Sequence, residues 1–280
     1  MNQRINELKK ELQELIGAQT CTVTPEMELI RELKYKEAKR ESKLHGKSYS
    51  IVDLKEGRFA YHVSAHDKWL SAPVIDINEP NNLEQIYNLT HPDDLQKVIE
   101  NELRGINFML ELPIEKKEDF QFLYMRRLLD KSGNFQLCLH RLSVAVWDET
   151  GKPWLLQNCT EKLPGYFKNL SQISEFYLLF PLTQPNRKKR EIFVNNIWLT
   201  EQELNILQLV YDGRNQLYIA KKNFISVRTV KTHFTTIRMK LNMNNIHMAS
   251  VFAKLTGILM QLLFLWIEWG EDIEEIMKGI

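Results

Sequence analysis

The stretch Ser226–Phe234, which reads SVRTVKTHF, decides the fold of the C-terminal part of this 280-residue chain. Serine commonly caps the first turn of a helix. The apolar residues that follow recur at a spacing that places them on one side of a helix. These residues are Val230, Phe234, Ile237 and Leu241. The pattern predicts a helix over about 226–241, with threonines and basic residues on its other sides.

Three further helices are expected around this one. Thr200 and Glu203 stand where a capping box opens a helix. Asp212-Gly213 ends that helix, because glycine readily adopts the left-handed conformation. Ile219-Ala220 lies in a second, short helix, and a fourth covers about 246–256. The sequence therefore predicts an all-α domain of four helices.

Acidic residues are missing from a long part of this region. No aspartate or glutamate occurs between Gly213 and Ile267, although the whole chain has a net charge of only +1. The same stretch carries lysine or arginine at positions 214, 221, 222, 228, 231, 238, 240 and 254. The need for solubility alone would explain the lysines but not the missing acids, because soluble surfaces normally carry charges of both signs. Because DNA affinity comes largely from neutralising phosphates, the distribution favours DNA binding.

Residues Leu199–Leu259 resemble the DNA-binding domain of LuxR-type regulators from end to end, and Thr-Val-Lys-x-His at 229–233 is the most specific part. The resemblance implies a helix-turn-helix that binds double-stranded DNA, with the helix at about 226–241 in the major groove. It implies a transcription regulator. One short recognition helix per chain suggests that the protein acts as a homodimer on two half-sites.

The resemblance also suggests a role for each residue of this interface. Base-edge contacts are expected from Lys231, Thr232 and Thr235, since lysine donates to guanine and a threonine methyl packs on a thymine methyl. Phosphate contacts fix the register without reading sequence. They are expected from Arg228, Thr229, Arg238 and Lys240, and from Lys221 and Lys222 on the preceding helix. Ser226 completes the set as the cap, and His233 is expected to pack within the domain.

Three positions depart from the LuxR-type pattern. Tyr218 stands where an acid is usual. Asn242 replaces a common glycine, which is tolerable because asparagine accepts a positive φ. Ile246 stands where an arginine often pairs with the glutamate of the first helix. Glu203 is therefore expected to lack its usual ion pair.

Residues 46–162 have a different pattern. Two β-rich runs, 49–53 and 59–63, flank a turn and predict a hairpin. Residues 76–104 read as helical and loop-rich, with Pro92 in the first turn of a helix. Three more strand-like runs follow, separated by turn clusters, at 120–129, 135–147 and 154–159. The order predicts an α+β domain with a single five-stranded antiparallel sheet.

This order resembles a PAS domain over residues 46–162. The resemblance rests on the hairpin around Gly57, the segment His91-Pro92-Asp93-Asp94, the run from Phe120-Gln121-Phe122 to Arg126-Arg127, and the turns Asp130…Gly133 and Asp148…Gly151. It implies a sensory or dimerisation module that answers a small-molecule or protein signal. No cofactor is expected, since the flavin-adduct cysteine motif is absent. The histidines are read as surface or packing residues rather than haem ligands; they are His62, His66, His91 and His140.

The remaining segments flank these two domains. Helical spacing of apolar residues, and the cap Thr24-Pro25-Glu26, predict two helices within 1–45. Residues 163–192 read as a linker, and its basic run Arg187–Arg190 suits a solvated linker and phosphate contacts equally. The DNA-binding domain then covers 193–259. Residues 260–280, apolar and then acidic, are expected to form a C-terminal helix that packs against the PAS-like domain or a second subunit.

Composition and cysteine usage favour a cytoplasmic protein. The three cysteines, at 21, 138 and 159, have no metal-ligand spacing and suit a reducing compartment. The charged N-terminus lacks the apolar core of a signal peptide. The apolar run 258–267 is shorter than the roughly 20 residues that cross a bilayer. Neither a metal nor a membrane is therefore an expected partner.

Two other classes of function compete with a transcription regulator. A sigma-factor-like protein would use the same helix-turn-helix to meet polymerase, but residues 48–162 do not read as a promoter-melting region rich in aromatic and basic residues. An enzyme would need a nucleophile–base pair, a metal cluster or a phosphate loop, and the sequence shows no such pattern. The prediction is a non-enzymatic, sequence-specific DNA-binding regulator.

Overall fold

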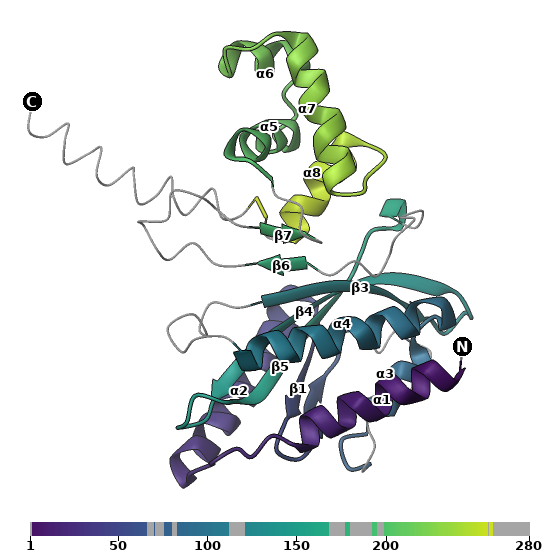
Figure 1. The fold of residues 1–280 in the computed structure, drawn as a ribbon, viewed down its shortest axis with the longest axis vertical. Helices are drawn as coiled ribbons and strands as arrows, with labels where there is room; N and C mark the ends of the chain where they lie inside the picture. Colours follow the sequence, from purple (N-terminus) through teal and green to yellow (C-terminus); the bar gives the residue numbers. More distant parts are fainter. Residues whose placement is uncertain are drawn as a thin grey trace, which may run out of the picture. The chain divides into compact units, whose positions relative to one another are not determined.

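The computed structural model describes residues 2–65, 70, 76–79, 83–111, 121–167, 177–179, 192–194, 199–256 and 258–259. The chain divides into two compact units, Met1–Leu178 and Leu179–Ile280. Figure 1 shows the elements of both units, coloured along the chain. The two N-terminal helices belong to the first unit. The finer division into five segments stays a prediction.

Both N-terminal helices are present. α1 covers Asn2–Gly17 and α2 covers Pro25–His45. Thr24 caps α2, and its side-chain oxygen accepts from the backbone nitrogen of Met27 at 3.4 Å. Gly46, with a φ of +63°, ends the helix in the left-handed conformation that glycine adopts without strain. The local sequence signals therefore fixed the start and end of α2.

The first unit contains the five-stranded antiparallel sheet that the PAS resemblance predicts. Its strands are β1 (Ser48–Asp53), β2 (Arg58–Val63), β3 (Gln121–Leu129), β4 (Phe135–Trp147) and β5 (Pro153–Lys162). They lie in the order β2-β1-β5-β4-β3, with β1 pairing β5 as well as β2. The short helix α3 (Leu83–Leu89) and the long helix α4 (Pro92–Glu111) separate the hairpin from the last three strands. Pro92 is the first residue of α4, as expected.

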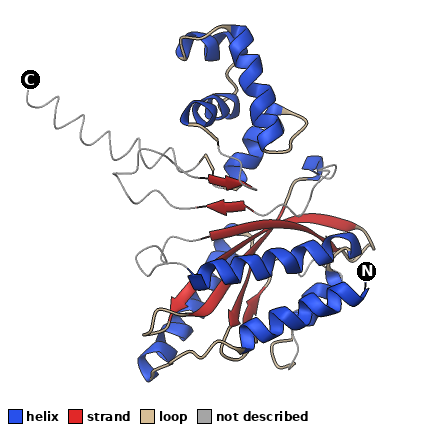
Figure 2. Cartoon of the chain, in the orientation of Figure 1, coloured by secondary structure: helices blue, strands red, loops and turns tan. Residues whose placement is uncertain are grey.

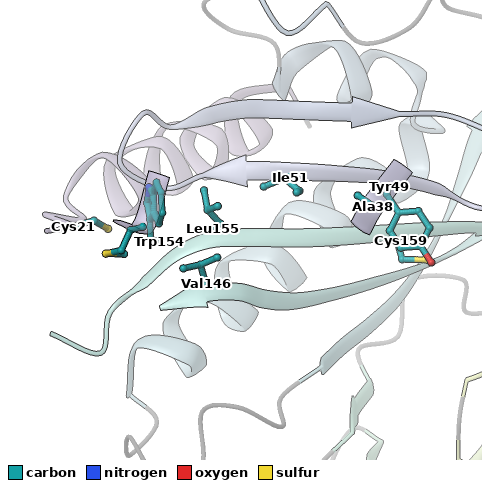
Figure 3. Packing of buried hydrophobic residues seen from close by; sticks show 9 residues of the cluster. Cys21, Ala38, Tyr49, Ile51, Val146, Trp154, Leu155 and Cys159 are labelled. Atoms are coloured by element: carbon teal, nitrogen blue, oxygen red, sulfur yellow. The ribbon is translucent and has the colours of Figure 1, made fainter. Parts of the chain in front are cut away.

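One face of the sheet packs against α2. Ala38 of α2, only 1 % exposed, belongs to a cluster with side chains of β1, β4 and β5. Figure 3 shows Ala38 beside Tyr49 and Cys159 at one end of this cluster, and Trp154 near Cys21 at the other. All three cysteines are buried and free. The large apolar side chains of this cluster explain why a helix as charged as α2 stays on the sheet.

The opposite face is covered by α4, which packs on β3, and α1 packs on α4 (Figure 2). Gly105 of α4 makes a close approach possible, because a Cβ atom there would lie 3.0 Å from the ring of Phe122. Both faces of the sheet are therefore covered by helices. Burial is most complete in β1, in which all six residues are buried, whereas β2 has one buried residue of six.

Within residues 199–259 of the second unit, the described part contains four helices. They are α5 (Glu201–Tyr211), α6 (Gln216–Lys222), α7 (Val227–Lys240) and α8 (Ile246–Leu255). Two three-residue strands, β6 (Tyr177–Leu179) and β7 (Ile192–Val194), precede them in the chain. His66, the basic run 187–190 and the segment 260–280 lie outside the described residues. Among the helices that are described, none has the length and apolar character that a membrane span requires.

Candidate nucleic-acid interface

The four helices enclose a small apolar core that fixes how α7 is presented. Leu207 of α5, Ile219 of α6, Val230 and Ile237 of α7, and Phe252 of α8 are all fully buried. Leu241 is also buried, whereas Phe234 is half-buried. The predicted apolar side of α7 is therefore the side that packs on the other helices. Its remaining sides are free to carry polar residues.

Each helix start is fixed by a side-chain cap. The hydroxyl of Thr200 accepts from the backbone nitrogen of Glu203 at 3.2 Å, and the Glu203 carboxylate accepts from the backbone nitrogen of Thr200 at 2.7 Å. This is the capping box expected from the sequence. Asn215 caps α6, and Ser226 caps α7 by accepting from the backbone nitrogen of Thr229 at 3.0 Å. Ser226 thus has the capping role predicted for it.

The turn between α6 and α7 is compact. Phe224 has a φ of +55°, which is unusual for an aromatic residue, and its side chain is 96 % exposed. The backbone nitrogen of Ile225 donates to the carbonyl of Ala220 at 3.0 Å, closing the end of α6. Sequence reasoning missed Phe224, because neither its apolar character nor its neighbours indicate exposure. Asn242 was recognised, and it has the predicted positive φ, at 49°.

The exposed sides of α7 are mainly polar and basic. Arg228, Lys231, Thr232 and Thr235 lie on them, and all four are exposed. The hydroxyl of Thr232 donates to the carbonyl of Arg228 at 3.3 Å, and that of Thr235 to the carbonyl of Lys231 at 3.2 Å. With their hydroxyl hydrogens held by the helix, these threonines offer methyl groups and oxygen lone pairs to a partner. The structure therefore brings the predicted base-contacting residues together on one surface.

The predicted phosphate-contacting residues differ in how far their charged groups are already engaged within the domain. Lys221 and Lys222 are exposed in the last turn of α6. The half-buried Arg238 donates from Nη1 to the carbonyl of Asn244 at 3.2 Å and lies 3.4 Å from the hydroxyl of Thr235. Arg214, omitted from the predicted set, is exposed and lies over the ring of Tyr218, 5.0 Å from its centroid. Its place next to the cap Asn215 was the signal that could have identified it.

Glu203 has no ion pair with position 246, but it pairs with Lys240 instead. Lys240, at the end of α7, places its Nζ atom 2.7 Å from Oε2 of Glu203. Ile246 offers no charge, and the flexible lysine side chain supplies the counter-charge from another helix. The glutamate side chain is only 4 % exposed, so the pair is largely removed from water. Among the candidate residues, Lys240 is thus already engaged within the domain.

No site for a metal ion was found in the part of the chain that the structure describes, where no group of three or more histidine, cysteine or acidic side chains could hold one. His233 is half-buried on α7. In the first unit, His140 is fully buried and accepts at Nε2 from Nε of Arg126 at 2.9 Å. His140 is therefore a packing residue within a hydrogen-bonded cluster.

Comparison with known proteins supports the interpretation of the four helices as a LuxR-type domain. Residues 198–255 match the family described as bacterial regulatory proteins, luxR family. The chain is 42 % identical over 55 residues to the transcriptional regulatory protein LiaR of Bacillus subtilis, a match that covers 20 % of this chain and 26 % of the relative. The chain thus spans about a quarter of that relative's length.

Two solved structures share weaker similarity. The Vibrio cholerae VqmA dimer, described with the LuxR-type receptors, has 13 % identity and a TM-score of 0.30 over 80 % of this chain and 88 % of its own. A PAS sensor domain from Marinobacter aquaeolei has 15 % identity and a TM-score of 0.32 over 41 % and 94 %. TM-scores this low support no inference about the present chain. The family match stands without them: residues 198–255 are a helix-turn-helix domain of the luxR family of bacterial regulatory proteins.

Proposed function

We propose that this protein regulates transcription by binding specific double-stranded DNA sequences, with α7 in the major groove. The observation that carries the proposal is the exposed side of α7, where Arg228, Lys231, Thr232 and Thr235 lie together in a stretch without any acidic residue. An α-helix fits the major groove, which presents a distinct pattern of donors and acceptors for each base pair.

We propose a division of labour among the polar residues of α7. Lys231, Thr232 and Thr235 are all exposed and are proposed to contact base edges. Arg228, Thr229 and Arg238, with Lys221 and Lys222 from α6, are proposed to bind phosphates. Lys240 is the exception, because its ammonium already pairs with Glu203. Lys240 is therefore left out of the proposed DNA-facing surface.

We further propose that the protein acts as a homodimer in the cytoplasm and that the PAS-like unit receives the controlling signal. One recognition helix per chain reads a short site, and a two-fold dimer doubles the number of bases read. The family match lies with regulators, and nothing in it favours the sigma-factor alternative.

The test begins with genomic DNA fragments that the purified protein retains, which identify its binding site. Lys231→Ala is expected to weaken binding to that site by roughly 1–3 kcal/mol, the scale of one good base contact. Lys254→Ala is the matched control. It removes the same charge from α8, where the ammonium lies over the Tyr211 ring, and changes affinity little. If the folded Lys231→Ala variant binds the site as tightly as the wild type, the assignment of α7 is overturned.

A further inference from the structure

Phe224, in the turn between α6 and α7, is a large apolar side chain that the fold does not use. It is 96 % exposed, more than any other large apolar side chain in the described part of the chain. Burial of such a ring would stabilise the domain, whereas a ring left in water contributes nothing. The side chain of Phe224 therefore has no packing role within the four helices.

The backbone conformation of Phe224 is also unfavourable for this residue type. Its φ of +55° lies in the left-handed region, where glycine and asparagine are common and bulky residues are rare. Asn242, the other non-glycine residue with a positive φ among those described, is of the tolerant type. Glycine at position 224 would relieve the strain with almost no loss of buried surface. An aromatic residue that is both strained and exposed points to a use outside the domain.

The turn holds the backbone of Phe224 in place from both sides. On one side, Nδ2 of Asn223 donates to the carbonyl of Ile219 at 2.9 Å, and its Oδ1 accepts from Nδ2 of Asn205 on α5 at 2.9 Å. On the other side, the backbone nitrogen of Ile225 is bonded to the end of α6. Because the backbone is already fixed, a partner that contacts the ring orders little of the chain on binding.

Phe224 lies between residues of α6 and α7 that are proposed to contact DNA. Lys222, two residues before it, is proposed to bind phosphate, and Ser226, two residues after it, caps the helix proposed to enter the groove. Two residues of chain span at most about 7 Å. The first residues of a recognition helix are the ones that reach base edges. Since residues 213–267 include no acid, no neighbour of Phe224 in the sequence repels phosphate.

The chemistry of the major groove determines which group this ring can contact. Base edges there present hydrogen-bond donors and acceptors, which a phenyl ring cannot satisfy, and one apolar group, the C5-methyl of thymine. We propose that the ring of Phe224 packs against a thymine methyl at the edge of the binding site and so specifies a T·A pair there. This inference rests on the proposed function, because it requires α7 to lie in the major groove. A protein bound at Phe224 would instead compete with DNA for the start of α7.

The experiment replaces single thymines of the identified binding site by deoxyuridine, which lacks only the methyl group. For the wild-type protein, one replacement at the edge of the site is expected to lower affinity by about threefold to fivefold, the contribution of one buried methyl group. Phe224→Ser is expected to abolish the effect of that replacement, whereas the other thymines keep theirs. This loss of additivity between one side chain and one methyl group identifies the contact.

Two further substitutions separate the ring from the backbone strain. Phe224→Gly removes both, so the variant is expected to fold about as stably as the wild type and to bind the site about fivefold more weakly. Phe224→Tyr keeps the ring and is expected to keep both the affinity and its dependence on the thymine methyl. Neither variant is expected to change the salt dependence of binding, since no phosphate contact is lost.

Leu217→Ser is the matched control for the loss of an exposed apolar side chain. Leu217 lies near the start of α6 and is 58 % exposed. Its replacement is expected to change neither the affinity nor the effect of any deoxyuridine replacement. Fluorescence anisotropy with the full-length protein measures binding, and thermal unfolding shows that each variant is folded.

The proposal is overturned if Phe224→Ser removes the effect of no thymine methyl, or if Leu217→Ser has the same effect. It is also overturned if the Phe224 variants bind the site as the wild type does but fail to regulate transcription, because the ring would then serve a protein partner. Weaker binding by Lys231→Ala together with unchanged binding by Phe224→Gly would reject this contact and leave the proposed function standing. A wild-type protein that retains no specific DNA would reject both.

Discussion

Lys240 of α7 and Glu203 of α5 form a largely buried ion pair, with 2.7 Å between Nζ and Oε2. The same Oε2 atom accepts from the backbone nitrogen of Thr200, so one carboxylate closes the capping box of α5 and also holds α7. The lysine side chain is 22 % exposed, whereas the glutamate is only 4 % exposed. Loss of Lys240 would leave a buried charge, whereas loss of Glu203 would leave a charge that is closer to solvent.

Lys240→Met is expected to destabilise the second unit more than Glu203→Gln. The first change leaves a buried carboxylate without a counter-charge, whereas the second leaves an ammonium that can swing into water. We expect losses of roughly 2–4 kcal/mol and roughly 1–2 kcal/mol respectively. Hydrogen exchange of α5 and α7 amides in the full-length protein measures both. Equal losses, or a larger loss in Glu203→Gln, would contradict this account of the pair.

Substitutions at Ser226 should separate stability from DNA binding. Ser226→Ala removes the cap of α7 and is expected to cost about 1 kcal/mol of stability. Ser226→Asp keeps a capping oxygen and suits the positive end of the helix, so it should fold at least as stably as the wild type. Its charge, however, would stand close to phosphates, and DNA affinity should fall by tenfold or more. Thermal unfolding and fluorescence anisotropy with the identified site test the pair, and undiminished affinity in Ser226→Asp would place the start of α7 away from the DNA.

The salt dependence of DNA binding should distinguish exposed from engaged cations. Arg228→Ala is expected to reduce the slope of log K against log salt by about one, because one phosphate contact is lost. The loss of affinity should be similar for specific and unrelated DNA. Lys240→Met, measured below its unfolding temperature, should leave the slope unchanged because its ammonium pairs with Glu203. A reduced slope in Lys240→Met would mean that the ion pair opens when DNA binds.

Asp148 should make the first unit less stable in acid. Burial alone raises the pKa of this carboxyl, but hydrogen bonds from the backbone of Thr22 and Lys152 and from Thr150 outweigh it and leave the pKa below its usual 3.8. Since the folded-state pKa is lowered, the stabilisation is complete above about pH 4 and is lost as the pH falls below it. Asp148→Asn should therefore cost roughly 1–3 kcal/mol at pH 7 and progressively less towards pH 3. Urea unfolding measures this, with the exposed neighbour Glu149→Gln as a control that changes little; a cost independent of pH would contradict the prediction.

Much of the fold could be predicted from local sequence signals. The caps Thr24, Thr200 and Ser226 placed helix starts, because such signals act within a few residues. Turn residues and the β-rich runs between them predicted all five strands. The Lys240–Glu203 pair could not be predicted, because it depends on how two helices cross and on a rotamer of a long side chain. The hydrogen-bonded cluster around Arg126 could not be predicted for the same reason, because its members come from α3, α4 and three strands.

For the interface, the sequence identified which side of α7 is exposed, because the spacing of buried residues defines it. It could not identify which cations are free, because ion pairing within the domain competes with binding. Arg214 was missed because its exposure depends on the loop between α5 and α6, and Phe224 because its exposure depends on the turn between α6 and α7. The assignment of base and phosphate contacts stays a prediction that the variants above test.

The helices on both faces of the sheet have a consequence for protein engineering. A chimera that joins this sensor to a different output domain would usually begin at the first strand, near Ser48. Such a fusion would lack α2, which covers Ile51 and Leu155, and α1, which packs on α4. With the α2 face of the sheet uncovered, the strands would be prone to self-association. A transplantable sensor must therefore carry residues 1–45 with the sheet.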